Sequence, residues 1–573
     1  MFSDNKIFVY CILEMADEFD LQQSLEQQGE SFLMQNRTFA YVNDSNNGSY
    51  NGSSQITIDC SGIANSGKYM SFQQSFLQIP LVMSLSALVG QLNNVTGENN
   101  FAACLKNSYT TLIHSLNAEM SNNSVVATTS YTNMAINYNL LTSMSAEDEK
   151  NIGPTLNFAK DDVLSMRYNA VANVNGLGES NNIITRPLFD PNLGYGLSSF
   201  THNSGRLARM MNSTSYDIAM RNTESIQNVI ASGKNYSQRD NITQNPGVAT
   251  GTVINYYIIA TIPLSILSDL FAKMPLVKGS YLKLTLNLNT GCTTTMTMAN
   301  NTFTSVVSSS PNNCVPYQIS PCITGQGFNP AGTAACTSAS LSISVARNTV
   351  GAITYNHPSL SSCRLYCCLY DLSPSCETMY LSKMPTKKVK YEDIISFQTL
   401  NVPQNGTFSQ VLTNGISRVR KLIGITQIAS TFNNAGTAGT IAPMNSPFSC
   451  APSTSTSSAI TNFNVLLSGV QLYSQNYSLG IEHFFQELRK VNSINGGSTL
   501  GMSSGLISQS DFENGYRFIT ADLSRKASEA VDNIAKSVQV IGTNSSSLPI
   551  DIYWFVYYER EIEIDIQTGS LIA

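Results

Sequence analysis

The stretch that decides the fold, DIYWFVYYEREIEIDIQ at residues 551–567, contains two strand patterns in succession. Its first half is apolar throughout, as expected of a strand that is buried on both faces. In its second half Ile562, Ile564 and Ile566 alternate with acidic residues, and this period-two pattern is typical of a strand with one buried face. Together the two patterns predict a long β-strand near the end of the chain.

Period-two alternation also occurs elsewhere, in YLKLTLNLNTG at 281–291 and SLSISVAR at 340–347. Helical spacing is rare: IEHFFQELRKV at 481–491 is the clearest case, and LSILSDLFAKM at 264–274 is stopped by Pro275. Polar stretches at 293–313 and 430–462 are interpreted as long loops. The sequence therefore predicts an all-β protein with long loops and a few short helices.

Two segments begin alike, and this suggests a tandem arrangement. SQITIDC at 54–60 leads through a loop into SFLQIPLVM at 75–83, and LSISVAR at 341–347 leads through a loop into CRLYCCLYDL at 363–372. We therefore expect two β-sandwiches. The predicted units are an N-terminal arm at 1–55, sandwiches at 56–310 and 311–567, and a C-terminal tail at 568–573.

The composition narrows the function classes. Of the 573 residues 12% are charged, about half the usual ~25% share, and the net charge is -6, so no overall positive field favours nucleic acid. The basic run Lys383–Lys390 is interpreted as a solvated loop, because no aromatic residues are interleaved with it. No apolar run approaches the ~18 residues that span a bilayer. The composition points mildly to extensive protein contacts, with biased codon usage as the alternative.

The start of the chain makes a poor signal peptide, because KIFVYCIL is followed at once by acidic residues, and Met15 is a second plausible start. Without export the 12 cysteines should stay reduced, and we expect them to be small buried hydrophobes. The N-x-[ST] sequons, such as those at Asn36, Asn94, Asn212 and Asn405, are then expected to be unused.

Residues 62–69, GIANSGKY, fall one position short of the phosphate-binding loop G-x-x-x-x-G-K-[ST]. Tyr69 cannot supply the hydroxyl that binds magnesium, and the residues that follow alternate like a strand, whereas the loop requires a helix. We interpret Gly62 and Gly67 as turn residues between two strands, with Lys68 pointing to solvent.

Two other patterns could indicate catalysis or metal binding. Gly501–Gly505 fits the nucleophile elbow around Ser503, but that fold supplies its histidine after the serine. The four histidines, His114, His202, His357 and His483, all precede Ser503 and lack metal-ligand spacing; His114 is interpreted as a satisfied core residue. Glu147, Asp148 and Glu149 are interpreted as an exposed acidic loop. The sequence therefore predicts no enzyme and no catalytic, cofactor-binding or metal-binding residue.

Five blocks resemble the double jelly-roll major capsid proteins of the tectivirus and adenovirus lineage, most closely those of virophages and polinton-like viruses. The blocks are LKNSYTTLIHSLNAEMSNNSVVATTSYTN (105–133), LSDLFAKMPLVKGSYLKLTLNLNT (267–290), CRLYCCLYDLSPSCETMYLSKMPTKKVKYED (363–393), GLISQSDFENGYRFITADLSR (505–525) and SVQVIGTNSSSLPIDIYWFVYYEREIEIDIQTG (537–569). They are spread over most of the chain after residue 55, in the order of the family. The start of the chain and the polar stretch after residue 293 depart from the family pattern.

The resemblance implies two side-by-side jelly rolls, homotrimers forming pseudohexagonal capsomers, and an icosahedral shell in the virion with penton and minor capsid proteins as further partners. It implies no cofactor, no specific nucleic-acid binding and no transmembrane segment. The alternative is a secreted β-sandwich adhesin or carbohydrate-binding protein, favoured by the sequons and the Ser, Thr and Asn content. An enzyme using Lys68 or Ser503 is the third hypothesis.

Overall fold

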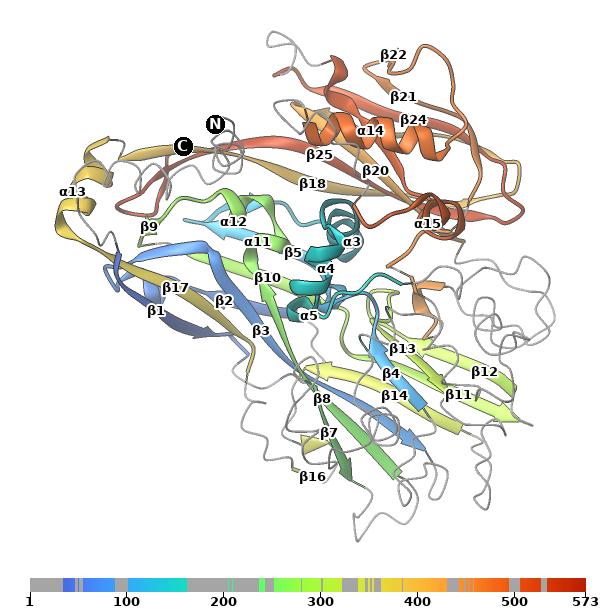
Figure 1. Ribbon diagram of the computed structural model, residues 1–573, viewed down its shortest axis with the longest axis horizontal. Coiled ribbons are helices and arrows are strands. Elements are labelled where there is room, and N and C mark those ends of the chain that lie inside the picture. The colour runs from blue at the N-terminus through green and yellow to red at the C-terminus, as the bar shows by residue number, and fades with distance from the viewer. Residues whose placement is uncertain are drawn as a thin grey trace, which may run out of the picture.

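The computed structural model describes residues 34–46, 50, 55–87, 101–161, 205, 209, 237–242, 252–279, 281–299, 302–321, 338–345, 349–350, 353–354, 362–383, 385–429, 443–447, 450–451, 453–456, 458–493, 505–526 and 533–572. Strands make up most of these residues, as Figure 1 shows. Within the described ranges no helix is both long and apolar enough to span a membrane.

Eight strands from the first part of the chain form two antiparallel layers that share a hydrophobic core. One layer has the order β1 (Met34–Asn43), β17 (Arg364–Leu372), β3 (Tyr69–Ala87) and β9 (Val277–Lys278). The other has the order β2 (Gln55–Asp59), β10 (Leu282–Leu288), β5 (Ile113–Met120) and β6 (Asn123–Val126).

Eight strands from the last part of the chain form a second sandwich. Its first layer has the order β18 (Thr386–Val402), β25 (Ile550–Asp565), β20 (Val419–Ile428) and β23 (Ile519–Asp522), with β26 (Leu571–Ile572) beside β25. Its second layer has the order β19 (Thr407–Ile416), β24 (Lys536–Asn544), β21 (Ile460–Leu467) and β22 (Val470–Gln471).

The two sandwiches have the same topology. When the eight strands of each are numbered along the chain, one layer has the order 1-8-3-6 and the other 2-7-4-5 in both sandwiches. Two four-stranded sheets in this wound order form a jelly roll. The predicted fold class, two tandem jelly rolls with a few short helices, is confirmed.

The predicted boundary at residues 310 and 311 does not match the sheets. Strands β14 (Ser338–Val345) and β17 both pair with β3 of the first jelly roll, so the similar beginnings of the two segments do not mark two sandwiches. The change of sheet falls at α13 (Pro374–Lys383), which separates β17 from β18. Part of the predicted N-terminal arm is strand β1, and part of the predicted C-terminal tail is strand β26.

Further strands extend the first jelly roll at one end (Figure 1). The 19-residue β3 continues beyond the sandwich and pairs there with β8 (Thr252–Pro263) and β14. The polar stretch interpreted as a loop is instead the paired strands β11 (Cys292–Ala299) and β12 (Thr302–Ser309). The remaining strands are β7 (Ser237–Ile242), β4 (Phe101–Leu105) with β13 (Tyr317–Pro321), and β15 (Thr349–Val350) with β16 (Ile353–Thr354).

Strand β25 explains why the opening stretch is apolar throughout. Trp554 and Val556 point into the core of the second jelly roll, whereas Tyr553, Phe555 and Tyr557 belong to a cluster continuous with the first jelly roll. One face of β25 thus packs in the core of the second jelly roll, and the other packs at the contact between the two jelly rolls. Both faces are therefore shielded from water. The predicted strand buried on both faces is confirmed.

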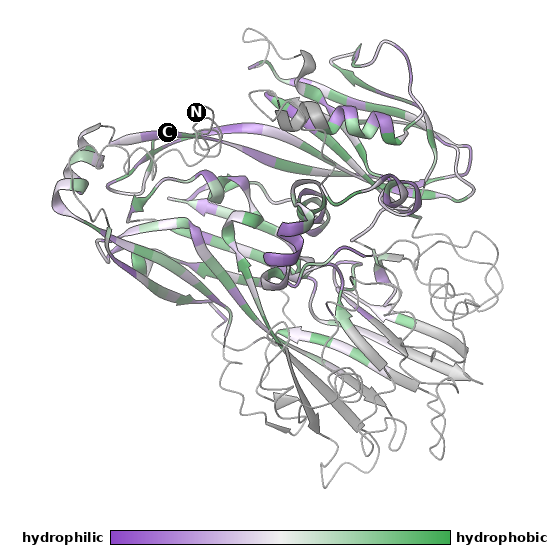
Figure 2. Ribbon diagram, in the orientation of Figure 1, coloured by the Kyte–Doolittle hydropathy of each residue, from purple (hydrophilic) through white to green (hydrophobic). Residues whose placement is uncertain are grey.

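The helices lie in the connections between strands. Pro275 follows α12 (Asp269–Lys273), as expected. Helix α14 (Ile481–Ser493) is amphipathic, because Phe484 and Leu488 are buried and Glu482 is exposed, and Figure 2 shows green and purple residues along it. The helices are α2 (Ser61–Ala64), α3 (Thr132–Ser143), α4 (Ala146–Asn151), α5 (Gly153–Leu156), α11 (Leu264–Leu267), α12 (Asp269–Lys273), α13, α14 (Ile481–Ser493) and α15 (Gln509–Asn514), with single 3-10 turns at Tyr109–Leu112, Pro443–Asn445 and Leu523–Lys526.

Nine cysteines lie within the described residues, and all nine are buried free thiols, as predicted for them. Burial raises the pKa of the Cys314 thiol to about 11, which keeps it protonated near neutral pH. Six of these cysteines lie in the core cluster that includes the first jelly roll, and Cys368 and Cys376 lie in a smaller cluster, where they behave as small hydrophobic side chains.

Candidate functional site

At the junction between the two jelly rolls, buried charged groups link segments that lie far apart in the chain. Asp393, on β18, is 3% exposed. Its Oδ2 accepts hydrogen bonds from the backbone N–H of Ala127 at 3.1 Å, from the hydroxyl of Tyr558 at 3.1 Å and from Nη1 of Arg560 at 3.0 Å. A carboxylate in this position joins the second jelly roll to the segment that follows β6 in the first.

Arg560 makes the reciprocal contacts. Its guanidinium donates to the carbonyl oxygens of Ser124 at 2.8 Å and Val125 at 3.1 Å, both on β6. The hydroxyl of Tyr391 also donates to the carbonyl of Val125. Because burial raises the pKa of Tyr391, its phenol stays protonated and remains a donor. The carbonyl oxygens near the end of β6 therefore accept hydrogen bonds from side chains of β18 and β25.

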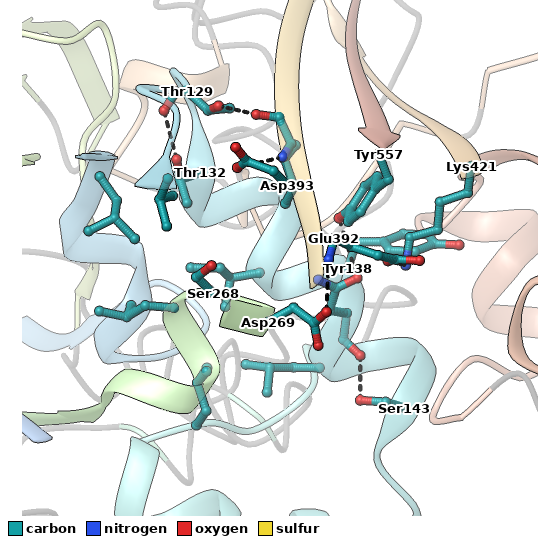
Figure 3. A pocket seen from close by; sticks show the side chains of 18 of the residues that line it. Thr129, Thr132, Tyr138, Ser143, Ser268, Asp269, Glu392, Asp393, Lys421 and Tyr557 are labelled. Atoms are coloured by element: carbon teal, nitrogen blue, oxygen red, sulfur yellow. Dashed lines mark hydrogen bonds and ion pairs between the residues drawn. The ribbon is translucent and has the colours of Figure 1, made fainter. Parts of the chain in front are cut away.

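A cavity of about 530 Å³ lies beside this cluster, between α3, α11, α12, β18 and β25 (Figure 3). The charged groups along it are paired. Lys421 places Nζ 3.3 Å from Oε2 of Glu392 and 4.1 Å from the ring centre of Tyr557, while Oδ2 of Asp269 lies 2.8 Å from Nζ of Lys273. Asp269 also accepts from the backbone N–H of Glu392 at 2.9 Å, which ties α12 to β18.

A second buried ion pair, in the connection between β6 and β9, lies against the second jelly roll. Nη2 of Arg209 lies 2.8 Å from Oδ1 of Asp161, and both side chains are almost fully excluded from solvent. Oδ2 of Asp161 accepts from the hydroxyl of Ser453 at 2.8 Å, and its backbone carbonyl accepts from the hydroxyl of Tyr516 at 2.9 Å. Since Ser453 and Tyr516 belong to the second jelly roll, this network fixes both domains to one carboxylate.

Helix α3 lies between these two networks and is buried on almost every side. Nδ2 of Asn137 donates to the carbonyl of Ser453, and the hydroxyl of Tyr138 is 2.7 Å from that of Thr520. A helix enclosed all round in this way belongs to an interior. The contacts of α3 therefore fix the two jelly rolls relative to one another. Within the described ranges, no group of three or more His, Cys, Asp or Glu side chains could hold a metal ion.

The phosphate-loop candidate lies where the strand pattern placed it, between β2 and β3. Gly67 has a φ of +72°, which confirms a turn there, while Gly62 lies inside the short helix α2. The Lys68 side chain, which was expected to point to solvent, is 31% exposed, and its Nζ lies 3.0 Å from Oδ2 of Asp371 on β17 in a partly exposed ion pair. Strand β3 follows where the phosphate-binding loop requires a helix.

The other candidates are not brought together. His114 is partly buried with its ring against Tyr131, but no described residue hydrogen-bonds its Nδ1, so the expectation of a satisfied histidine is wrong. His483 contacts Tyr473 and Tyr477 in the second jelly roll. His202, His357 and Ser503 lie outside the described residues, as do Asn94 and Asn212.

Two charged runs have secondary structure that the sequence analysis missed. Lys387, Lys388 and Lys390 lie within β18, so the prediction of a loop is wrong for them. The prediction that they are solvated holds for Lys388 and Lys390, whose side chains are 64% and 62% exposed beside the glutamates of β25. Glu147–Glu149 begin helix α4, in which Asp148 forms a capping box with Ser145. Glu149 also accepts a hydrogen bond from the backbone N–H of Lys160 at 2.6 Å.

The junction residues Asp161, Arg209, Asp393 and Arg560 were not singled out from the sequence. Each carries an ordinary charge in a segment without a recognisable motif, and their partners lie far away in the chain. The one available signal was the apolar run at 551–558, which required a contact on each face of β25.

Comparison with known proteins gives no match to a family model and no match among curated protein sequences. Solved structures match over nearly the whole chain at low identity. A chain of the Sputnik virophage cryo-EM structure is 12% identical, with 95% of this chain and 89% of that chain covered and a TM-score of 0.47. The Faustovirus major capsid protein is 10% identical, with 98% and 99% covered and a TM-score of 0.42, and the mavirus major capsid protein is 10% identical, with 93% and 89% covered and a TM-score of 0.40.

Proposed function

We propose that this chain is the major capsid protein of an icosahedral virus, and that three copies form a pseudohexagonal capsomer. The observation that carries the proposal is the repetition of one jelly-roll topology twice in a single chain, with the two copies joined by hydrogen bonds to Asp161 and Asp393, two buried residues. Three such chains place six similar domains around a ring, which is the unit needed to tile a shell with near-hexagonal symmetry.

The interdomain networks support this role because a shell subunit must hold its shape under contact with several neighbours. Asp161 and Asp393 each bind groups from both jelly rolls, and helix α3 is enclosed between them. Removing one partner of such a pair is strongly destabilising, so the two domains are expected to move as one body. On this proposal the protein is structural, is not an enzyme and belongs to the virion, with penton and minor capsid proteins as further partners.

The experiment is to express the full chain and measure its mass by light scattering, followed by negative-stain electron microscopy. The proposal expects trimers with a pseudohexagonal outline, or closed shells. A soluble protein that remains monomeric at micromolar concentration would overturn it.

A further inference from the structure

The cavity of about 530 Å³ at the domain junction is bounded by both jelly rolls. Helices α3, α11 and α12 belong to the connection between β6 and β9 of the first jelly roll, and β18, β20 and β25 belong to the second. Pockets that bind small organic molecules have volumes of roughly 300–1,000 Å³ and occur preferentially where two domains meet. The cavity therefore has the size and the position of a ligand site.

Much of the buried lining of the cavity is aliphatic. Six aliphatic side chains, each no more than 7% exposed, contribute to it: Leu116, Val126, Ile136, Leu140, Leu267 and Leu488. These side chains offer water no hydrogen bond, so they favour the alkyl part of a ligand.

Two carboxylates from different domains form a more exposed part of the lining (Figure 3). The side chains of Asp269, on α12, and Glu392, on β18, are 33% and 35% exposed. Asp269 makes its described contacts through Oδ2, with Nζ of Lys273 and with the backbone N–H of Glu392. Glu392 makes its described side-chain contact through Oε2, with Lys421. Oδ1 of Asp269 and Oε1 of Glu392 therefore keep the capacity to accept hydrogen bonds from a ligand.

The charge of the lining is negative. It includes three carboxylates and one cation: Asp269, Glu392, Asp393 and Lys421. The buried Asp393 is neutralised by Arg560, whereas Lys273, the partner of Asp269, is 42% exposed and forms a weak ion pair. An ammonium group has a positive charge and three donors, so it complements the two more exposed carboxylates.

We propose that the cavity binds a small aliphatic amine, with its ammonium group at Asp269 and Glu392 and its alkyl chain against the aliphatic lining. Because Asp269 belongs to the first jelly roll and Glu392 to the second, the bound amine stabilises their junction. A ligand that binds only the folded protein raises the melting temperature as its concentration increases. Assembly of the chain into trimers does not depend on this binding.

The first test titrates hexylamine into the full chain by isothermal titration calorimetry near neutral pH. Methylamine is the control for charge, and hexanoate is the control for the alkyl chain. Hexylamine is expected to bind at least about tenfold more tightly than methylamine, because it buries five further methylene groups. Hexanoate is expected not to bind, since its carboxylate would face two others. Equal affinity for the two amines, binding of hexanoate, or no binding of hexylamine would overturn the proposal.

The second test neutralises each carboxylate while keeping the shape of its side chain. Glu392→Gln and Asp269→Asn are each expected to weaken hexylamine binding by at least about tenfold. Glu147→Gln is the matched control, because Glu147 is exposed on α4 and lies outside the cavity lining. Fluorescence from Trp554, the single tryptophan, checks that each variant folds. Unchanged affinity in both folded cavity variants would overturn the site.

A variant that fills the cavity tests the site without changing its charge. Ser265, on α11, is half-buried and lines the cavity, so Ser265→Leu keeps both carboxylates but reduces the space for the alkyl chain. Its affinity for hexylamine is expected to fall, and unchanged affinity would contradict binding inside the cavity.

A lysine side chain of another protein is also an alkylammonium, so Nα-acetyl-lysine methylamide is titrated in the same way. Weaker binding of this compound than of hexylamine supports a free amine, and tighter binding would overturn it in favour of a lysine. Trimers or shells of a protein that does not bind hexylamine would overturn the amine site alone and leave the proposed function in place.

Discussion

Arg560 and Asp393 form an ion pair, 3.0 Å between Nη1 and Oδ2, that belongs to the second jelly roll but lies against the first. Asp393 is almost fully buried, whereas the Arg560 side chain is 29% exposed. The guanidinium also donates to two carbonyl oxygens of β6. One side chain thus neutralises a buried charge and closes the domain junction.

Replacing Arg560 by Ala should destabilise the protein by about 2–4 kcal/mol, because Asp393 would keep a buried charge without its cation. The measurement is urea unfolding at fixed protein concentration. Arg420→Ala is the control: Arg420 pairs with Glu559 at 2.8 Å, but both side chains are more than a fifth exposed, so a loss below about 1 kcal/mol is expected. Equal losses in the two variants would contradict the role assigned to Arg560.

Gly67→Val should cost about 1–2 kcal/mol of stability. A Cβ at this position meets no atom within 4 Å, and the expected cost comes from holding an L-residue at a φ of +72°. Lys68→Ala removes a partly exposed ion pair with Asp371 and should cost less than about 1 kcal/mol. Thermal melts of both variants show which one loses more stability. A larger loss for Lys68→Ala than for Gly67→Val would contradict the left-handed turn at Gly67.

Gly424→Ala should be more damaging, because the obstacle there is packing. A Cβ would lie 2.6 Å from Cζ3 of Trp554 and 3.0 Å from Cδ1 of Ile519. Overpacking of this kind costs about 1–3 kcal/mol. Trp554 emission should shift to the red as its ring is displaced. Gly415→Ala meets no atom within 4 Å and should leave both emission and stability nearly unchanged.

Stability should fall as the pH drops from 6.5 towards 4, in part through His114. Burial lowers the pKa of His114 from 6.5 to about 4. The unfolded chain therefore takes up a proton on this histidine before the folded protein does, and acid favours unfolding by about 1–3 kcal/mol across that window. His114→Phe keeps an aromatic ring against Tyr131 but cannot titrate, so its unfolding free energy should depend less steeply on pH. Parallel pH profiles for the two proteins would contradict this.

Much of the strand content could be predicted from the sequence, because burial of one face leaves a period-two mark. The leucines of β10, the isoleucines at the end of β25 and the apolar face of α14 all lie as their spacing predicted. The left-handed turn at Gly67 also had a local cause. These features depend on residues within a few positions of one another.

Pairing between distant strands could not be predicted in this way. Alternation shows which side chains of β14 and β17 are buried, but not that both strands pair with β3, more than 250 residues earlier. The lysines of β18 looked like a loop because their partner glutamates lie on β25. The positive charge of these lysines does not identify their partner strand, because any strand with acidic residues could pair with them.

The sequence by itself determined that this chain forms strands with buried faces, since alternation of apolar and polar residues is a local property of the backbone. Only the tertiary structure decided that the strands wind into two jelly rolls of the same topology and that their junction is held by Asp393 with Arg560 and by Asp161 with Arg209. It also decided that Phe39 and Tyr41 of the first jelly roll are exposed. Those outcomes depend on which distant surfaces meet, and that is set by the packing of the whole chain.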